Sequence, residues 1–453
     1  MPLETKLKAG VAVANITPPV GVDMTGFGGR PSGAIGIHDD IFAKVLVLDD
    51  GNQQLAIVTS DLLSLDFDLV KRIRDLIEAN IGIPPENVML SSSHTHSGPA
   101  TIILRGLGKR DEDYVDVLVK KIAGATQEAY NRRMDAKLGF GRTQVQIGVN
   151  RRQRLGDGNT VLGVNPDGPV APYVDVVRVD NAEGKPIAIF FSHAAHPVVL
   201  GGSNVLISAD YPGYAMRLVA QVEVGSVAMF GQGCCGNINS NPVGGTFEDA
   251  RRLGTILGAA VIGAAEQIKT ISDIVLQSRS RIIALPLQEP LEVSEAEALV
   301  ERYQKELSDL KARGEGRPRT YMAQGILEWA QDMLKLVKEP KPYPPLTPPK
   351  EGTQAFEIQA MQLGDVAIVA LTGEVFVELA LEIDARSPSR QTIVLGYTNG
   401  CIGYVPNEEA YPYGGYEVSS AYRYYGTLML KPETDRQIRN AAVELLTNMM
   451  RET

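Results

Sequence analysis

Cysteine, net positive charge and long apolar runs are all scarce in this sequence. Its 453 residues include only three cysteines, too few for a disulfide framework, so we expect reduced thiols in a cytoplasmic protein. The formal net charge of −10 argues against a nucleic-acid partner, because phosphate binding requires a basic surface. No window reaches the roughly 18 apolar residues that a membrane span needs. The first residues, MPLETKLKAG, lack the apolar segment of a signal peptide.

Histidine is also rare, but its few copies are clustered. Four of the five histidines form two pairs, His94 and His96 in SSSHTHSGPA and His193 and His196 in FFSHAAHPVVL. Imidazole is a frequent metal ligand and titrates near neutral pH. In an extended segment, residues two apart point the same way, so His94 and His96 can face one site. Because Pro197 favours an extended backbone at His196, we expect His196 rather than His193 to join that site.

Alternating strand and helix patterns predict an α/β fold with mixed β-sheets and flanking helices. The strand patterns lie at 13–19, 41–51, 54–61, the start of 87–99, 186–197, the start of 226–242, 356–374 and 391–400. The helical patterns lie at 68–82, 113–133 and 247–268, with a last helix from Glu433. Residues 136–152 are interpreted as two strands paired with each other.

Three of the predicted strands run out into polar loops, at residues 94–99, 193–197 and 232–242. In open α/β sheets ligands bind at the carboxyl ends of strands, so both histidine pairs are well placed for a site. A catalytic zinc takes about three N, O or S ligands and keeps a position for water. Glu374 in IVALTGEVFVEL also follows an apolar run and a glycine. It is therefore either a further ligand or an acid at a helix N-terminus.

The whole chain, residues 1–453, is interpreted as one catalytic domain with an insertion at 290–350. That insertion holds two charged amphipathic helices, about 292–313 and 320–338, before the proline-rich connector KEPKPYPPLTPPKEG. We interpret it as an inserted helical hairpin. It either packs plainly on the surface, forms a lid or makes a contact in a homo-oligomer.

Five segments, in this order, resemble the neutral/alkaline ceramidase family. They are SSSHTHSGP, HP…NVLISADYPGYA, GQGCCGNINSNP, LTGE and GYTNGCIGYVPNEEAY…GGYE. The resemblance runs from residue 10 to about residue 430. Members of this family are zinc-dependent amidases that cleave the N-acyl bond of ceramide. The resemblance therefore implies the fold of a ceramidase catalytic domain, a bound zinc ion and a small-molecule substrate.

Site residues follow from the resemblance position by position. The implied zinc ligands are His94, His196, Glu374 and Tyr404. The resemblance implies that His96 helps proton transfer or polarises the amide, and that Arg151 lies beside the scissile carbonyl. Tyr416, twelve residues after Tyr404, matches a second active-site tyrosine. Asp210 and Tyr214 lie in a matching loop and receive no defined role.

The sequence departs from the family where ceramidases have Gly-Asp-x-Ser-Pro. Here the turn reads GCCGNINSNP, so Asn237 replaces the acid and Asn239 replaces the serine. Asparagine cannot act as a nucleophile, but it can donate a hydrogen bond to an oxyanion. Ser240 is one position off and a weak substitute. We therefore expect a metal-activated water to attack the substrate, with Asn239 as a donor.

The predicted function is a zinc-dependent hydrolase that cleaves an amide, ester or lactone bond of a soluble polar substrate. We expect neither a leader nor the family's C-terminal β-sandwich domain in this protein, and we therefore expect a soluble substrate. Asp39, Asp40 and Asp61 could line a polar pocket. The alternatives are a true ceramide amidohydrolase, a metal-dependent lyase or isomerase, or a non-catalytic zinc-binding protein. A binuclear amidohydrolase barrel also uses His-x-His, but on its first strand, with more histidines than this chain has.

Overall fold

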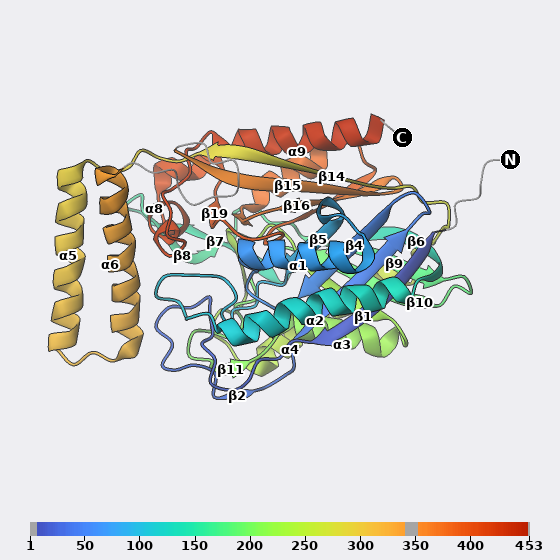
Figure 1. The fold of residues 1–453 in the computed structure, drawn as a ribbon, viewed down its shortest axis with the longest axis horizontal. Coiled ribbons are helices and arrows are strands. Elements are labelled where there is room, and N and C mark those ends of the chain that lie inside the picture. Colours follow the sequence, from blue (N-terminus) through green and yellow to red (C-terminus); the bar gives the residue numbers. More distant parts are fainter. Residues whose placement is uncertain (1–6, 340–351, 452–453) are drawn as a thin grey trace.

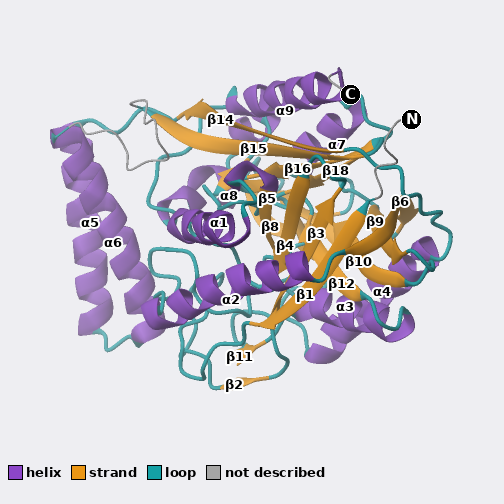
Figure 2. Ribbon diagram, turned by 45° about the vertical axis from the view of Figure 1, so that its right-hand side comes forward, coloured by secondary structure: helices purple, strands orange, loops and turns teal. Residues whose placement is uncertain are grey.

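The computed structural model describes residues 7–339 and 352–451, which form four layers. Two β-sheets pack face to face, and helices cover the outer face of each (Figures 1 and 2). The larger sheet has the strand order β12-β10-β9-β6-β1-β3-β4-β5, and the smaller one β14-β15-β16-β18. Parallel and antiparallel pairs occur in both sheets. The predicted mixed α/β class is thus confirmed.

The larger sheet consists of β1 (Lys8–Asn15), β3 (Phe42–Asp49), β4 (Gln54–Ser60), β5 (Val88–Ser92), β6 (Met134–Gln144), β9 (Tyr173–Asn181), β10 (Pro186–His193) and β12 (Val227–Gln232). The smaller sheet consists of β14 (Leu276–Pro286), β15 (Thr353–Leu363), β16 (Val366–Leu371) and β18 (Gln391–Leu395). Short strands form three further small sheets: β2 (Gly36–Ile37) with β11 (Leu206–Ile207), β7 (Gly148–Arg154) with β8 (Thr160–Asn165) and β13 (Ile238–Ser240), and β17 (Glu374–Val375) with β19 (Tyr404–Val405).

The helices divide between the two outer faces. Helices α1 (Phe67–Ile81), α2 (Glu112–Asn131), α3 (Asp210–Val222) and α4 (Phe247–Ala265) cover the larger sheet. Helices α7 (Val377–Arg386) and α9 (Thr434–Arg451) cover the smaller sheet. The short helix α8 (Tyr416–Ser419) lies near the site, between the 3-10 turns Glu408–Tyr413 and Ala421–Arg423. A further 3-10 turn, Pro85–Asn87, leads into β5.

Strand β3 shows why two layers of core form around the larger sheet. Its even and odd side chains point to opposite faces, as the two-residue period of a strand requires. Val45 and Val47 pack with α1 and α2, whereas Leu46 and Leu48 pack between the two sheets. Nearly every residue of this strand is apolar because both of its faces are buried.

Most sequence-predicted elements are confirmed, but the pairing predicted within residues 136–152 is wrong. β6 pairs with β1 and β9 in the large sheet, whereas β7 pairs with β8 and β13 in a separate small sheet. The alternating pattern predicts that each segment is a strand, but it contains no information about which distant strand completes the ladder. The first predicted strand, 13–19, also begins earlier, at Lys8.

The predicted insertion is a helical hairpin of α5 (Val293–Ala312) and α6 (Arg317–Lys338), which stand side by side at one end of the molecule (Figure 1). Helix α5 begins with a capping box between Glu292 and Glu295, and α6 begins with Pro318 in its first turn. The proline-rich connector falls largely on residues 340–351, outside the described residues. The described helices include none that is long and apolar enough to span a bilayer.

Candidate active site

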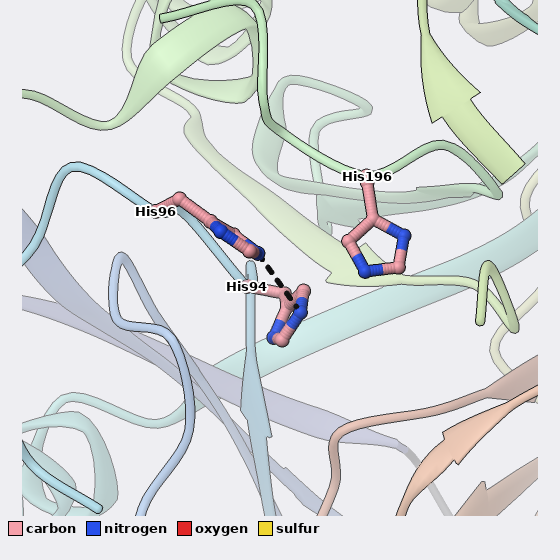
Figure 3. A group of neighbouring side chains, drawn as sticks. All are labelled: His94, His96 and His196. Atoms are coloured by element: carbon pink, nitrogen blue, oxygen red, sulfur yellow. Dashed lines mark hydrogen bonds between the residues drawn. The ribbon is translucent and has the colours of Figure 1, made fainter. Parts of the chain in front are cut away.

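Three histidines from two distant segments meet at the carboxyl ends of β5 and β10 (Figure 3). His94 and His96 follow β5, and His196 follows β10; all three are buried. Their ring nitrogens lie within 4.8 Å of one another. The extended backbone expected between His94 and His96 is wrong, because His94 has a left-handed φ of 63°. The two rings nevertheless approach each other, with 3.2 Å between their Nε2 atoms.

Backbone carbonyls fix the orientation of two of these rings. Nδ1 of His94 donates to the carbonyl of Leu63 at 2.8 Å, and Nδ1 of His196 donates to that of Cys235 at 2.6 Å. A carbonyl oxygen only accepts, so Nδ1 of each ring carries a proton, which leaves Nε2 as the atom that can bind a metal ion. Burial, followed by the charge of Arg151, lowers the pKa of His196 to about 4, so this ring is neutral at pH 7.

Glu374 brings a third acceptor to the same point. Its Oε2 lies 3.1 Å from Nε2 of His196 and 3.3 Å from Nε2 of His94. Burial alone raises the pKa of this carboxyl, but the two histidines outweigh it and hold the pKa well below its usual range. Two imidazole Nε2 atoms and a carboxylate oxygen converge in a buried place, and all three are acceptors whenever the rings are neutral. Such acceptors repel one another unless a proton or a cation lies between them.

Two tyrosines from different segments lie beside Glu374. Glu374 of β17 is the register partner of Tyr404 of β19, so both predicted ligands are adjacent by backbone geometry. The hydroxyl of Tyr425 donates to Oε1 of Glu374. Tyr425 was not among the residues expected at the site. Its only sequence signal was its place in a tyrosine-rich segment, which does not distinguish it from Tyr422 or Tyr424.

His96 occupies a tighter environment than the other two rings. Its Nδ1 is buried and has no hydrogen-bond partner among the described residues. The ring of Phe27 meets it edge-on with 4.9 Å between centroids, and the guanidinium of Arg30 donates to its backbone carbonyl. A Cβ on Gly26 would come within 2.6 Å of Nδ1, and this residue has a φ of +95°. Burial, then the neighbouring histidines, lower the pKa of His96 well below its usual range.

Arg151 forms a polar wall next to the histidines. Its Nε donates to Glu417 at 2.8 Å, and its Nη1 donates to Oδ1 of Asn239 at 3.1 Å. Its Nη2 is buried without a partner among the described residues. The ring of Tyr404 lies 5.3 Å from the guanidinium and meets that of Tyr416 edge-on at 5.6 Å. Since Arg151 holds the oxygen of Asn239, the amide NH2 of that side chain is left as a donor.

These groups border one cavity of about 650 Å³. Seven of the eight residues predicted for the site line it: His94, His96, Arg151, Asn239, Glu374, Tyr404 and Tyr416. His196 lies behind this surface, bonded to Glu374. The remaining walls are mostly apolar and include Phe27, Leu63, Leu104, Leu107, Val198 and Met322. The volume is within the usual range for small-molecule sites.

Other residues singled out from the sequence lie elsewhere or have structural contacts. His193 points away, with its Nδ1 bonded to the carbonyl of Tyr173 at 2.7 Å. The amide of Asn237 accepts from the backbone of Val377 and donates to Glu378, so it fixes the start of α7. Ser240 borders the cavity, but its hydroxyl bonds to a backbone carbonyl.

The five further polar residues are all absent from the cavity wall. Asp39 binds Arg217 and Ser208, and Asp61 accepts from the backbone of Phe42. Asp40 accepts from Thr17, Asp210 accepts from the backbones of Leu200 and Tyr211, and Tyr214 bonds to His38. The polar pocket expected from Asp39, Asp40 and Asp61 is therefore not part of this cavity, because each acid is committed to local contacts.

The chain is similar in sequence and in structure to known proteins. Residues 7–258 match the model of the neutral/alkaline non-lysosomal ceramidase N-terminal domain. The chain belongs to this family. It is 26% identical over 272 residues to neutral ceramidase A of Dictyostelium discoideum, covering 55% of this chain and 38% of that protein. It is 24% identical over 463 residues to the neutral ceramidase of Pseudomonas aeruginosa, covering 91% and 68%.

The fold agrees with this assignment. The crystal structure of the neutral ceramidase from Pseudomonas aeruginosa superposes with a TM-score of 0.73 at 20% identity, covering 99% of this chain and 75% of that one. A ceramidase solved with the ligand named C2 gives the same TM-score at 19% identity. The chain spans only 38% and 32% of the length of the curated relatives from Dictyostelium discoideum and Drosophila pseudoobscura pseudoobscura.

Proposed function

We propose that this family member is a metal-dependent hydrolase of an amide bond. The observation that carries the proposal is the convergence of three potential ligand atoms in a buried place: Nε2 of His94, Nε2 of His196 and Oε2 of Glu374. Nitrogen and oxygen donors of this kind fit zinc, and Tyr404, the register partner of Glu374, would complete the set. Zinc supplies Lewis acidity, which lowers the pKa of water towards ~7 and polarises a carbonyl oxygen.

The chain's own residues would orient and stabilise the reacting amide. The unpaired Nη2 of Arg151 and the amide NH2 of Asn239 are donors for the carbonyl oxygen as it gains negative charge. Each preorganised donor of this type contributes roughly 10²–10³ to the rate. Tyr416 lies in the same wall, and its hydroxyl would add a third donor. Glu417 holds the guanidinium of Arg151 in place with a 2.8 Å ion pair.

His96 would hold the proton that the leaving nitrogen needs. His96 borders the cavity, so its ring is placed to pass a proton to a bound substrate, whereas its Nδ1 is buried against Gly26 and has no partner among the described residues. The rings of Phe27 and His94 restrict its orientation. Its Nε2 also lies close enough to His94 for a role as an additional ligand.

The walls of the cavity favour a substrate with an apolar arm. Aromatic and aliphatic side chains form most of the surface, whereas the polar donors gather near the histidines. We therefore propose an N-acyl amide whose acyl part is apolar and whose amine part is polar. The walls thus favour ceramide, the substrate suggested by the names of the relatives and one of the alternatives from the sequence, over the soluble polar substrate expected first. A cytoplasmic location and a homo-oligomer stay predictions.

Hydrolysis of a matched substrate panel tests the proposal. The purified protein is loaded with zinc and offered ceramide in detergent, an N-acyl amino sugar, and an amide, ester and lactone of the same acyl group. We expect release of free acid from at least one amide, with loss of activity on chelation and recovery on adding zinc. The isosteric Glu374→Gln variant serves as the inactive control. Zinc binding without hydrolysis of any member would favour a non-catalytic binding protein.

The contact between Tyr425 and Glu374 predicts tuning of metal affinity. This hydroxyl holds Oε1, which leaves Oε2 directed at the two histidines. We expect Tyr425→Phe to weaken zinc binding about 10–100-fold, the usual effect of removing a residue that orients a ligand. Competition with a chromophoric chelator measures the affinity without any substrate. Tyr424→Phe is the matched control, since Tyr424 borders the same cavity. Equal affinity of both variants and wild type would contradict this role.

A further inference from the structure

The helical hairpin reaches the catalytic cavity through a single side chain of α6. Met322 lies in the cavity wall together with Phe27, Leu104 and Leu107, far along the chain from every residue that surrounds the histidines. Neither α5 nor any other described residue of α6 borders this cavity. The hairpin is therefore part of the substrate site, and its contribution is an apolar one.

Glycines set the depth at which Met322 enters the wall. A Cβ on Gly325 would come within 2.5 Å of the backbone nitrogen of Gly106, and a Cβ on Gly106 within 2.9 Å of the Cα of Met322. A Cβ on Gly28 would meet the sulfur of Met322 at 2.6 Å. Helix and loop thus approach to a separation that only glycine allows. This contact fixes the position of Met322 relative to the cavity.

Polar contacts fasten the hairpin to the body on either side of Met322. Arg317, at the start of α6, forms an ion pair of 2.7 Å with Asp23. Further along α6, Asp332 pairs with Arg105, and the indole of Trp329 donates to the carbonyl of Thr427 at 2.9 Å. Helix α6 is thus held to the body of the protein on both sides of Met322, which fixes the position of this side chain in the cavity wall.

We propose that Met322 limits the length of the apolar arm that the cavity accepts, and that this arm is an aliphatic acyl chain. That the arm is an acyl chain depends on the proposed function, whereas the limit on its length depends only on the packing of α6. The catalytic groups hold the amide at one part of the cavity, and Met322 closes part of its apolar wall. Methionine suits this position because its unbranched, polarisable side chain adapts to an alkyl end.

Two variants change the wall in opposite directions. Met322→Ala removes the thioether and lengthens the apolar space, whereas Met322→Trp shortens it. We expect the alanine variant to prefer an acyl chain about two carbons longer than wild type does. Each additional methylene that the cavity accommodates should raise kcat/KM roughly fourfold. The tryptophan variant should prefer a shorter chain than wild type. N-acyl amides with one amine and unbranched acyl chains of increasing length provide the activity profile.

Calorimetric binding of the matching n-alkanoates to the zinc-loaded protein gives a second profile that needs no turnover. Leu327→Ala is the control, because Leu327 is buried inside the hairpin and does not border the cavity. An unchanged length preference in Met322→Ala and Met322→Trp would overturn the proposal, as would an equal shift in Leu327→Ala. If no amide is hydrolysed but alkanoate preference shifts as expected, the proposed function fails and the length limit stands.

Discussion

Replacing His94 or Glu374 by alanine should remove the bound metal ion and the hydrolase activity together. Each side chain contributes one of the three converging ligand atoms, and its loss leaves only two of them with Tyr404, a set without the two histidines and one carboxylate that the proposed zinc site needs. We expect about one zinc per chain in the wild type and a content near zero in either variant. Elemental analysis of the purified proteins measures the metal, and amide hydrolysis under the same conditions measures activity.

His193→Ala provides a demanding control for this result. His193 is equally buried and lies only three residues from His196, but its ring bonds to the carbonyl of Tyr173. Its loss should leave the metal content unchanged, and circular dichroism verifies that each variant is folded. Activity that persists in metal-free protein would reject metal-dependent hydrolysis. Two metal ions per wild-type chain would instead favour binuclear chemistry.

Replacing His96 by glutamine should slow the reaction while leaving the metal in place. If His96 transfers a proton to the leaving nitrogen, kcat should fall by roughly 10²–10⁴. An ester with a good leaving group, such as a nitrophenolate, needs no proton at this step and should lose far less. The comparison of amide and ester rates therefore separates a proton-transfer role from general damage to the site.

The metal content of the same variant decides between two roles for His96. Its Nε2 lies 3.2 Å from that of His94, and the three histidine rings are close enough to share one ion. Zinc retained in His96→Gln but lost in the matched His94→Gln variant would support the proton-transfer role. Loss of zinc from both variants would make His96 a ligand and leave the proton donor to another group.

The strand ends and the scarcity of histidine were sufficient to bring the histidines of the candidate site to attention. Short apolar runs bounded by turn residues favour buried strands, and a polar continuation favours a loop at the end of the strand. The sequence therefore places His94, His96 and His196 just beyond strand ends, where the structure has them. The preference for His196 over His193 agrees with their positions, since only His196 meets Glu374. Tyr404, Tyr416 and Arg151 came from the resemblance to ceramidases, and all three border the cavity.

Contacts between distant segments were not predictable in the same way. The partner of β6 is β9 and that of β7 is β8, although the sequence suggested that β6 and β7 pair with each other. Nothing in the residues around Tyr425 distinguishes it from its tyrosine neighbours, because its role depends on the position of Glu374. The approach of Met322 depends likewise on glycines more than two hundred residues away.

Local pattern in the chain was enough to specify the elements, the fold class and the chemical character of the site. All three properties depend on the spacing of apolar residues over short segments and on a few residue types at strand ends, and both can be read from the sequence. Tertiary packing was needed to bring the three acceptors together, to leave Arg151 a free donor among the described residues, and to make the cavity walls apolar. Those properties come from contacts between segments far apart in the chain, where register and close approach select one arrangement among many that local pattern allows.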